Sequence, residues 1–334
     1  MKNKYLFVFV MLFTILVVSF GFTNIYVSHN QQTEEEEFVV VTSFYPMYIA
    51  TMNVVGDIEG VTLKNLSEPQ TGCLHDFQLT PADMKLLSTA DVFIINGGGI
   101  ESFMEEIAAQ YPELVIVEAS EGIEFLCEDD AHGHEHEVHS EDEHIHEKEN
   151  HVEEEIGDGH NHDVNAHAWM SVELYRKQVE NIASALAEID KKHCESYLAN
   201  ASDYDGKLEA LQVEQDEVRT LVEGASTVMF HCAFDYVAED LGLDVVFCMD
   251  LDEERQVSAG EIAEVLEIIE HEGVKYIFAE ELYGAPMCEM IQKEADVMVI
   301  YLDPLNRGEY DFASYLKGMQ RNIELITSHV TARE

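Results

Sequence analysis

Basic residues are scarce in this chain of 334 residues, because 18 lysines and arginines stand against 67 aspartates and glutamates. The resulting formal net charge of -49 at pH 7 repels nucleic acids and anionic membrane surfaces and attracts cations. We therefore expect no nucleic-acid partner. Most of the acidic residues are spread along the whole chain, as is typical of a solvated surface.

Several sequence patterns that would indicate other functions are missing. The six cysteines contain no CxxC pair, which argues against a zinc ribbon or a thioredoxin-like motif. In an exported protein they could form disulfides, and Cys73 with Cys127, or two of Cys232, Cys248 and Cys288, fall in the same prospective lobes. The glycines of Asn96-Gly97-Gly98-Gly99 match no nucleotide-binding pattern and favour a strand-to-helix turn with close backbone approach.

The N-terminus carries an export signal. Met1-Lys2-Asn3-Lys4 precedes an apolar run from Tyr5 to Phe22, and residues 29–37 form a polar tether. No cleavage site stands out after this run, so residues 1–28 are either a signal peptide or an uncleaved membrane anchor. We expect an extracytoplasmic protein that is tethered to the outer face of the cytoplasmic membrane.

Alternating strands and helices predict an α/β fold with two lobes, each a mostly parallel sheet with flanking helices. The N-terminal lobe spans residues 38–127, and the C-terminal lobe spans 223–334. Between them, residues 164–222 contain long helical patterns with few breakers, which predict a rigid helical bridge. Strands are expected at Phe38–Thr42, Val61–Leu66, Val92–Asn96, Leu114–Glu118, Thr227–Phe230, Asp244–Cys248, Tyr276–Ala279 and Val297–Leu302.

Four polar residues lie at or near the ends of apolar runs and are separated by 92, 64 and 72 positions: His75, His167, His231 and Asp303. Ligands of open α/β sheets bind beyond the carboxyl ends of the strands, so these side chains can converge. Three imidazoles and a carboxylate suit four-coordinate zinc better than manganese, calcium or magnesium. The spacing therefore predicts a zinc site that the whole fold assembles.

Four segments carry a resemblance to a known family: residues 72–77 with 81–83, 165–171, 230–236 and 302–305. In this order, the chain resembles the metal-binding solute receptors of ABC importers, in particular their zinc-binding branch, over about residues 38–327. The resemblance implies that His75, His167, His231 and Asp303 bind the ion in a cleft between two lobes. Leu74 and Asn165-Ala166 depart from the glutamate and the aspartate-proline pair usual in that branch, and the lipid-attachment cysteine is absent.

Residues 128–163 hold nine of the sixteen histidines and fifteen carboxylates, with few apolar residues to form a core. We predict a disordered loop that binds additional zinc and could concentrate it, transfer it to the cleft or sense its abundance. Its histidines are His132, His134, His136, His139, His144, His146, His151, His160 and His162.

The leading functional prediction is a monomeric, non-enzymatic receptor that captures zinc and delivers it to an ABC permease in the membrane. An extracellular zinc buffer or a surface adhesin without a permease would share the same binding residues. A secreted zinc hydrolase is the third alternative, but the chain has no HExxH segment, and a carboxylate takes the position that a catalytic zinc leaves open.

Overall fold

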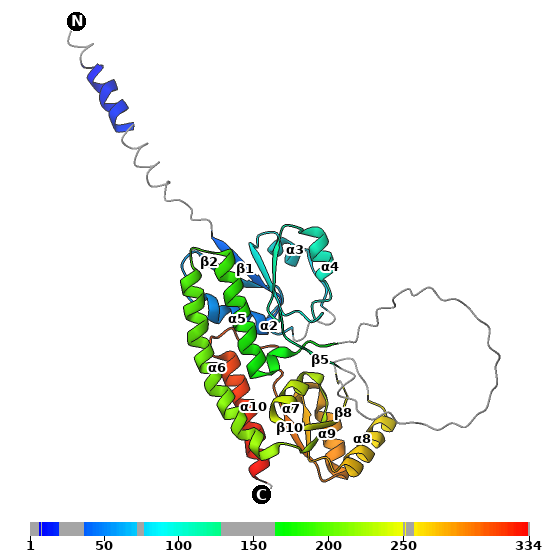
Figure 1. Cartoon of the computed structure of the whole chain (residues 1–334). Coiled ribbons are helices and arrows are strands. Elements are labelled where there is room, and N and C mark those ends of the chain that lie inside the picture. The colour runs from blue at the N-terminus through cyan, green and yellow to red at the C-terminus, as the bar shows by residue number, and fades with distance from the viewer. Residues whose placement is uncertain are drawn as a thin grey trace, which may run out of the picture.

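Two parallel four-stranded sheets, each covered by helices, form the two lobes of the computed structural model (Figure 1). The structure describes residues 7, 9–19, 37–71, 77–127, 164–249, 251 and 257–332. The strand order is β2-β1-β3-β4 in the first sheet and β10-β9-β7-β8 in the second. The predicted α/β class with two mostly parallel sheets is confirmed.

The first lobe contains strands β1 (Phe38–Thr42), β2 (Val61–Asn65), β3 (Val92–Ile95) and β4 (Val115–Glu118) with helices α2 (Tyr45–Val55), α3 (Pro81–Leu87) and α4 (Met104–Gln110). All four residues of β3 are buried, as expected for a strand covered on both faces. Helix α3 begins with a capping box, in which Thr80 accepts a hydrogen bond from the Asp83 amide and the Asp83 carboxylate accepts from the Thr80 amide.

The second lobe contains strands β7 (Ser226–Met229), β8 (Asp244–Cys248), β9 (Tyr276–Ala279) and β10 (Met298–Tyr301) with helices α7 (Asp235–Leu241), α8 (Ala259–Glu272) and α9 (Glu281–Glu294). Because proline is common in the first turn of a helix, the sequence pattern predicts that the last of these helices spans about residues 286–295, and its start is wrong by five residues. Helix α9 begins directly after β9, and Pro286 lies inside it at the cost of one backbone hydrogen bond.

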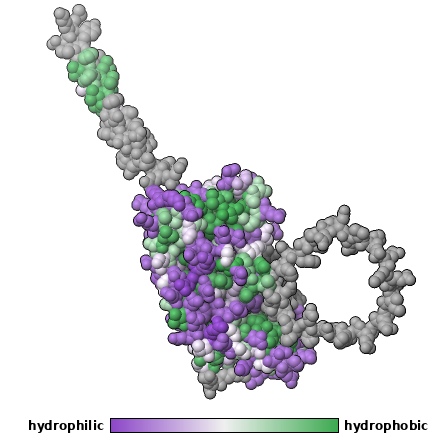
Figure 2. All heavy atoms as spheres, in the orientation of Figure 1, coloured by the Kyte–Doolittle hydropathy of each residue, from purple (hydrophilic) through white to green (hydrophobic). Residues whose placement is uncertain are grey.

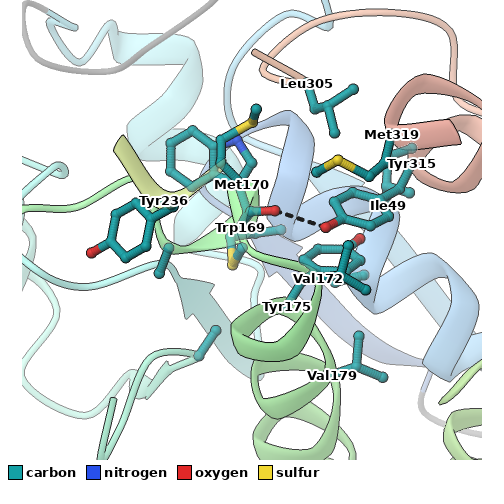
Figure 3. Close-up of a cluster of buried hydrophobic side chains, with 14 of the residues drawn as sticks. Ile49, Trp169, Met170, Val172, Tyr175, Val179, Tyr236, Leu305, Tyr315 and Met319 are labelled. Atoms are coloured by element: carbon teal, nitrogen blue, oxygen red, sulfur yellow. Dashed lines mark hydrogen bonds between the residues drawn. The ribbon is translucent and has the colours of Figure 1, made fainter. Parts of the chain in front are cut away.

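Helices α5 (Val172–Ile189), α6 (Cys194–Val222) and α10 (Ser314–Thr331) join the lobes (Figure 1). The 29 residues of α6 extend over about 43 Å, and this helix packs against α2 of the first lobe and α7 of the second. Tyr175 on α5 stacks on Tyr315 of α10 with a ring separation of 3.6 Å (Figure 3). One hydrophobic core therefore continues from the first sheet through these helices to the second, as expected for a stiff connection.

A second core covers the opposite face of the second sheet, where Ile277 and Val299 pack with Val265 and Ile269 of α8 and Ile291 of α9. No disulfide joins any two of the five cysteines in the described residues, so the pairing considered possible within the second lobe is not present there.

Residues 9–19 form a helix with exposed apolar side chains, shown in green in Figure 2. Among the residues that the structure describes, no helix combines the length and apolar character needed to cross a membrane.

Candidate metal site

The structure describes three of the predicted ligands and does not describe the others. His75 and all nine histidines of residues 128–163 lie outside the described residues. His167 lies directly before the short 3-10 helix η2 (Ala168–Met170), His231 follows β7, and Asp303 follows β10. The site must therefore be built from these three residues and their neighbours.

The second sheet places His231 at the position where α/β sheets bind ligands. Its strand order reverses direction between β7 and β9, which is the topological switch point. Met229 on β7 pairs with Phe278 on β9, so the residues two positions beyond each, His231 and Glu280, leave the sheet side by side. Nδ1 of His231 lies 3.3 Å from Oε2 of Glu280, and both residues are buried.

Asn165 holds the ring of His167. Its Oδ1 lies 2.8 Å from Nδ1 of His167 and accepts a hydrogen bond from the His167 amide at 3.1 Å. Its Nδ2 donates to the Cys232 carbonyl at 2.6 Å and to Asp235 Oδ2 at 3.1 Å. Since an amide oxygen only accepts, Nδ1 of His167 carries the proton, and Nε2 is the nitrogen with a lone pair for an ion.

The rings of His167 and His231 lie close enough to share one ion. Their centroids are 5.4 Å apart, and their planes meet at 81°. With Zn–N bonds of about 2.0–2.1 Å and tetrahedral angles, two imidazoles on one zinc have centroids roughly 5 Å apart. The separation of these rings therefore fits a shared zinc ion.

Arg307 neutralises the buried carboxylate of Glu280. Its Nη2 donates to Glu280 Oε1 at 2.9 Å, and its guanidinium carbon lies 5.7 Å from the centroid of the Tyr283 ring. Arg307 belongs to the same loop as Asp303, four residues further along the chain. The loop after β10 is thus linked to His231 through Glu280.

Asp303 lies on the wall of a cavity of about 320 Å³ that Tyr45, Arg307 and Lys317 also line. Although the residue is exposed, the surrounding protein desolvates its carboxylate, and this burial raises its pKa. Its Oδ1 accepts a hydrogen bond from the Leu305 amide at 2.9 Å. Within the described part of the chain, no three histidine, cysteine or acidic side chains gather closely enough to hold an ion, so Asp303 is not grouped with the two rings.

The first lobe supports His167 through a glycine turn. Gly97, Gly98 and Gly99 all have positive φ, and a Cβ on Gly98 would lie 2.8 Å from Phe125 and 3.1 Å from Ala166. Asn96, directly before the turn, donates to the Ala166 carbonyl at 2.9 Å. The close backbone approach predicted for these glycines is thus present, against the residue before His167.

Trp169 ties the segment of His167 to the loop of Asp303. Its Nε1 donates to the Pro304 carbonyl at 2.9 Å, and Tyr315 of α10 donates to the Trp169 carbonyl at 2.9 Å (Figure 3). The Trp169 side chain is fully buried, and its ring centroid lies 5.0 Å from that of His167. His167, His231 and the start of the Asp303 loop are therefore joined by direct hydrogen bonds and packing.

A family model matches the chain over residues 40–329, and its description is zinc-uptake complex component A, periplasmic. The chain belongs to this family. The zinc-uptake description indicates a transport component and not a class of enzymes. In this chain, His231 lies at the switch point of the second sheet, and the ring of His167 lies 5.4 Å from the ring of His231.

Two curated relatives illustrate the similarity. The chain is 28% identical over 322 residues to the zinc-binding protein AdcA of Streptococcus pyogenes serotype M6, with 91% of this chain and 58% of the relative covered. It is 28% identical over 293 residues to the high-affinity zinc uptake system protein ZnuA of Bacillus subtilis, with 86% of each covered. The chain thus spans a little over half the length of the first relatives it matches.

Solved structures show the same fold. The solute-binding protein FpvC of Pseudomonas aeruginosa in complex with Mn2+ superposes with a TM-score of 0.70 at 22% identity, covering 89% of this chain and all of the other. A crystal structure of ZnuA superposes with a TM-score of 0.65 at 22% identity, covering 87% and 99%. These likenesses support the two-lobe architecture.

Sequence reasoning did not single out Glu280 and Arg307, and it treated Asn165 only as a departure from a family pattern. A signal for Glu280 was present, since it directly follows a predicted strand, as His231 and Asp303 do. In a chain with 67 acidic residues, a single glutamate at a strand end carries little weight. The partners of Asn165 and Arg307 come from distant segments and required the fold.

Proposed function

We propose that this protein binds zinc outside the cytoplasm and delivers it to an ABC permease for uptake. The observation that carries the proposal is the pair His167 and His231, whose rings lie 5.4 Å apart at a switch point. Each Nδ1 faces a side-chain oxygen of the protein, which leaves each Nε2 available for a common ion. Membership in a zinc-uptake family supports zinc as the cargo.

The proposed ligands are His75, His167, His231 and Asp303. Three neutral imidazoles and one carboxylate form a donor set that zinc accepts in four-coordinate sites. Asp303 would join from the loop after β10, which Trp169 and Arg307 connect to the two histidines. Because these hydrogen bonds are short and the helical bridge is stiff, zinc binding should change the relative position of the two lobes only slightly.

Residues 128–163 are proposed to bring zinc to this site. The segment joins β5 (Leu126–Cys127) to β6 (Val164–Asn165), and these two strands pair in antiparallel fashion. Cys127 and Val164, which flank the histidine-rich segment, thus lie next to each other, and Val164 is three residues before His167. Zinc held by the segment would be concentrated close to the proposed binding site.

Zinc titration of the purified protein by calorimetry tests the binding site. In a variant that lacks residues 128–163, a two-residue Asn-Gly turn can connect Cys127 to Val164, because these residues already pair. We expect one tight binding event that persists in this variant and is lost in His167→Ala and His231→Ala. Loss of all binding with the segment would instead make the protein a histidine-rich buffer.

Uptake of radioactive zinc by cells tests delivery to a permease. A strain without the gene should take up less zinc at low external concentration, and the wild-type protein should restore uptake. His231→Ala should be present at the same level without restoring it. Normal uptake in the deletion strain would contradict the transport proposal while leaving zinc binding untouched.

A further inference from the structure

We propose that Glu280 positions His231 for zinc and that Arg307 prevents the Glu280 carboxylate from binding the ion itself. Together they would make the site select zinc over manganese. This inference rests on the proposed function. It concerns two residues that lie outside the ligand set and that meet only in the folded protein.

The first step is the contact between Glu280 and His231. Glu280 lies at the N-cap of α9 and is 6% exposed, so its carboxylate is directed into the protein. Its Oε2 lies 3.3 Å from Nδ1 of His231, close enough for the carboxylate oxygen to attract a proton that is held on this ring nitrogen. The contact favours the tautomer protonated on Nδ1, whose Nε2 lone pair can bind a metal.

The second step is the contact between Glu280 and Arg307. A carboxylate next to a metal-binding imidazole could also rotate to coordinate the ion, and oxygen ligands suit manganese better than they suit zinc. The other oxygen of Glu280 accepts a charge-assisted bond from Arg307 at 2.9 Å. Arg307 itself lies over the ring of Tyr283, with both terminal nitrogens 3.5 Å from the Tyr283 hydroxyl. Glu280 is therefore held from both sides.

Removal of the guanidinium should change which metal binds best. In Arg307→Gln the carboxylate is released, adds an oxygen to the ligand set and raises the affinity for manganese relative to zinc about tenfold. Arg307→Lys keeps the charge but loses the planar group over Tyr283, so this ratio should change less than in Arg307→Gln. Glu280→Gln should weaken zinc binding about 10–100-fold, the usual effect of removing a partner of a metal-binding histidine.

The test measures zinc and manganese dissociation constants of the full-length protein by competition with a chromophoric chelator. Visible absorption of the Co2+-loaded protein reports coordination number, and its bands should weaken in Arg307→Gln as a ligand is added. The double variant Arg307→Gln with Glu280→Gln should show no gain for manganese. Arg176→Gln is the matched control, because its ion pair with Asp205 joins α5 and α6, away from the ligands.

The outcomes separate this inference from the proposed function. An unchanged metal ratio and Co2+ spectrum in Arg307→Gln, or a manganese gain that persists in the double variant, would overturn the inference. Wild-type zinc affinity in Glu280→Gln would overturn the positioning of His231, even if the arginine variant does not fold. Failure of the wild type to bind zinc, or undiminished binding in His231→Ala, would refute the proposed function instead.

Discussion

The substitution Asn165→Asp should weaken zinc binding, although it restores the residue type usual in the zinc-binding branch. A carboxylate is a stronger acceptor than an amide for the Nδ1 proton of His167, so ring chemistry alone predicts tighter binding. In this chain, however, the hydrogen bonds of the Asn165 amide nitrogen determine how the substitution affects zinc binding. The amide nitrogen donates to the Cys232 carbonyl and to Asp235, and a carboxylate can donate to neither.

The cost follows from these contacts. Each lost hydrogen bond costs about 1 kcal/mol, and a second carboxylate about 3 Å from buried Asp235 adds a repulsion of similar size or larger. We expect a total loss of about 2–4 kcal/mol in the free energy of unfolding. To relieve the repulsion, the new side chain must rotate away from Asp235, and His167 then loses its acceptor. Zinc affinity should fall about 10–100-fold.

Urea unfolding and a competitive zinc titration measure the two effects. The double variant Asn165→Asp with Asp235→Asn supplies an amide donor from the opposite side and should recover most of both losses. Asn165→Ala should weaken zinc binding without this rescue, because it removes the acceptor and adds no charge. Wild-type stability and equal or tighter zinc binding in Asn165→Asp would refute the reasoning.

Three further predictions follow from the same structure. Trp169→Phe removes the donor to the Pro304 carbonyl and should lower the free energy of unfolding by about 2–4 kcal/mol, measured by circular dichroism because Trp169 is the only tryptophan. Burial raises the pKa of Asp240 to about 6, so its ionisation destabilises the fold as pH rises from about 4 to about 6. Asp240→Asn should therefore raise the free energy of unfolding at pH 7 by up to about 3 kcal/mol, measured by urea denaturation, with no difference below pH 4. Removal of zinc by a chelator should lower the Tm and leave the circular dichroism spectrum of the folded state unchanged, since free zinc at about 100 times Kd adds only about 2.7 kcal/mol.

The fold could be predicted from the sequence because the patterns that indicate strands and helices are local. Short β-rich runs alternate with helical patterns, and the strand predictions agree with the observed strands to within one or two residues. Pro286 misled the prediction of α9, because a proline at a helix start is more common than one in the second turn. Strand order and the short pair β5 and β6 depend on contacts between segments far apart in the chain, and no local pattern encodes them.

The candidate site could be predicted from the sequence only in part. His231 could be placed because it follows a strand, and the fold brings it next to His167, which lies 64 positions earlier. The groups that orient these rings could not be placed. Asn165 acts through Cys232 and Asp235, and Arg307 acts through Glu280, so each depends on tertiary packing between elements.

The way in which the two rings are held argues for a transported ion over a structural one. A structural zinc contributes folding energy by joining segments that do not otherwise hold together. Here the segments are joined by protein contacts alone: Asn165 bonds to Cys232, and Trp169 bonds to Pro304. The helical bridge further binds both lobes into one core. An ion shared by the two rings would therefore add energy to segments that protein contacts already hold together, and its release would not require the protein to unfold.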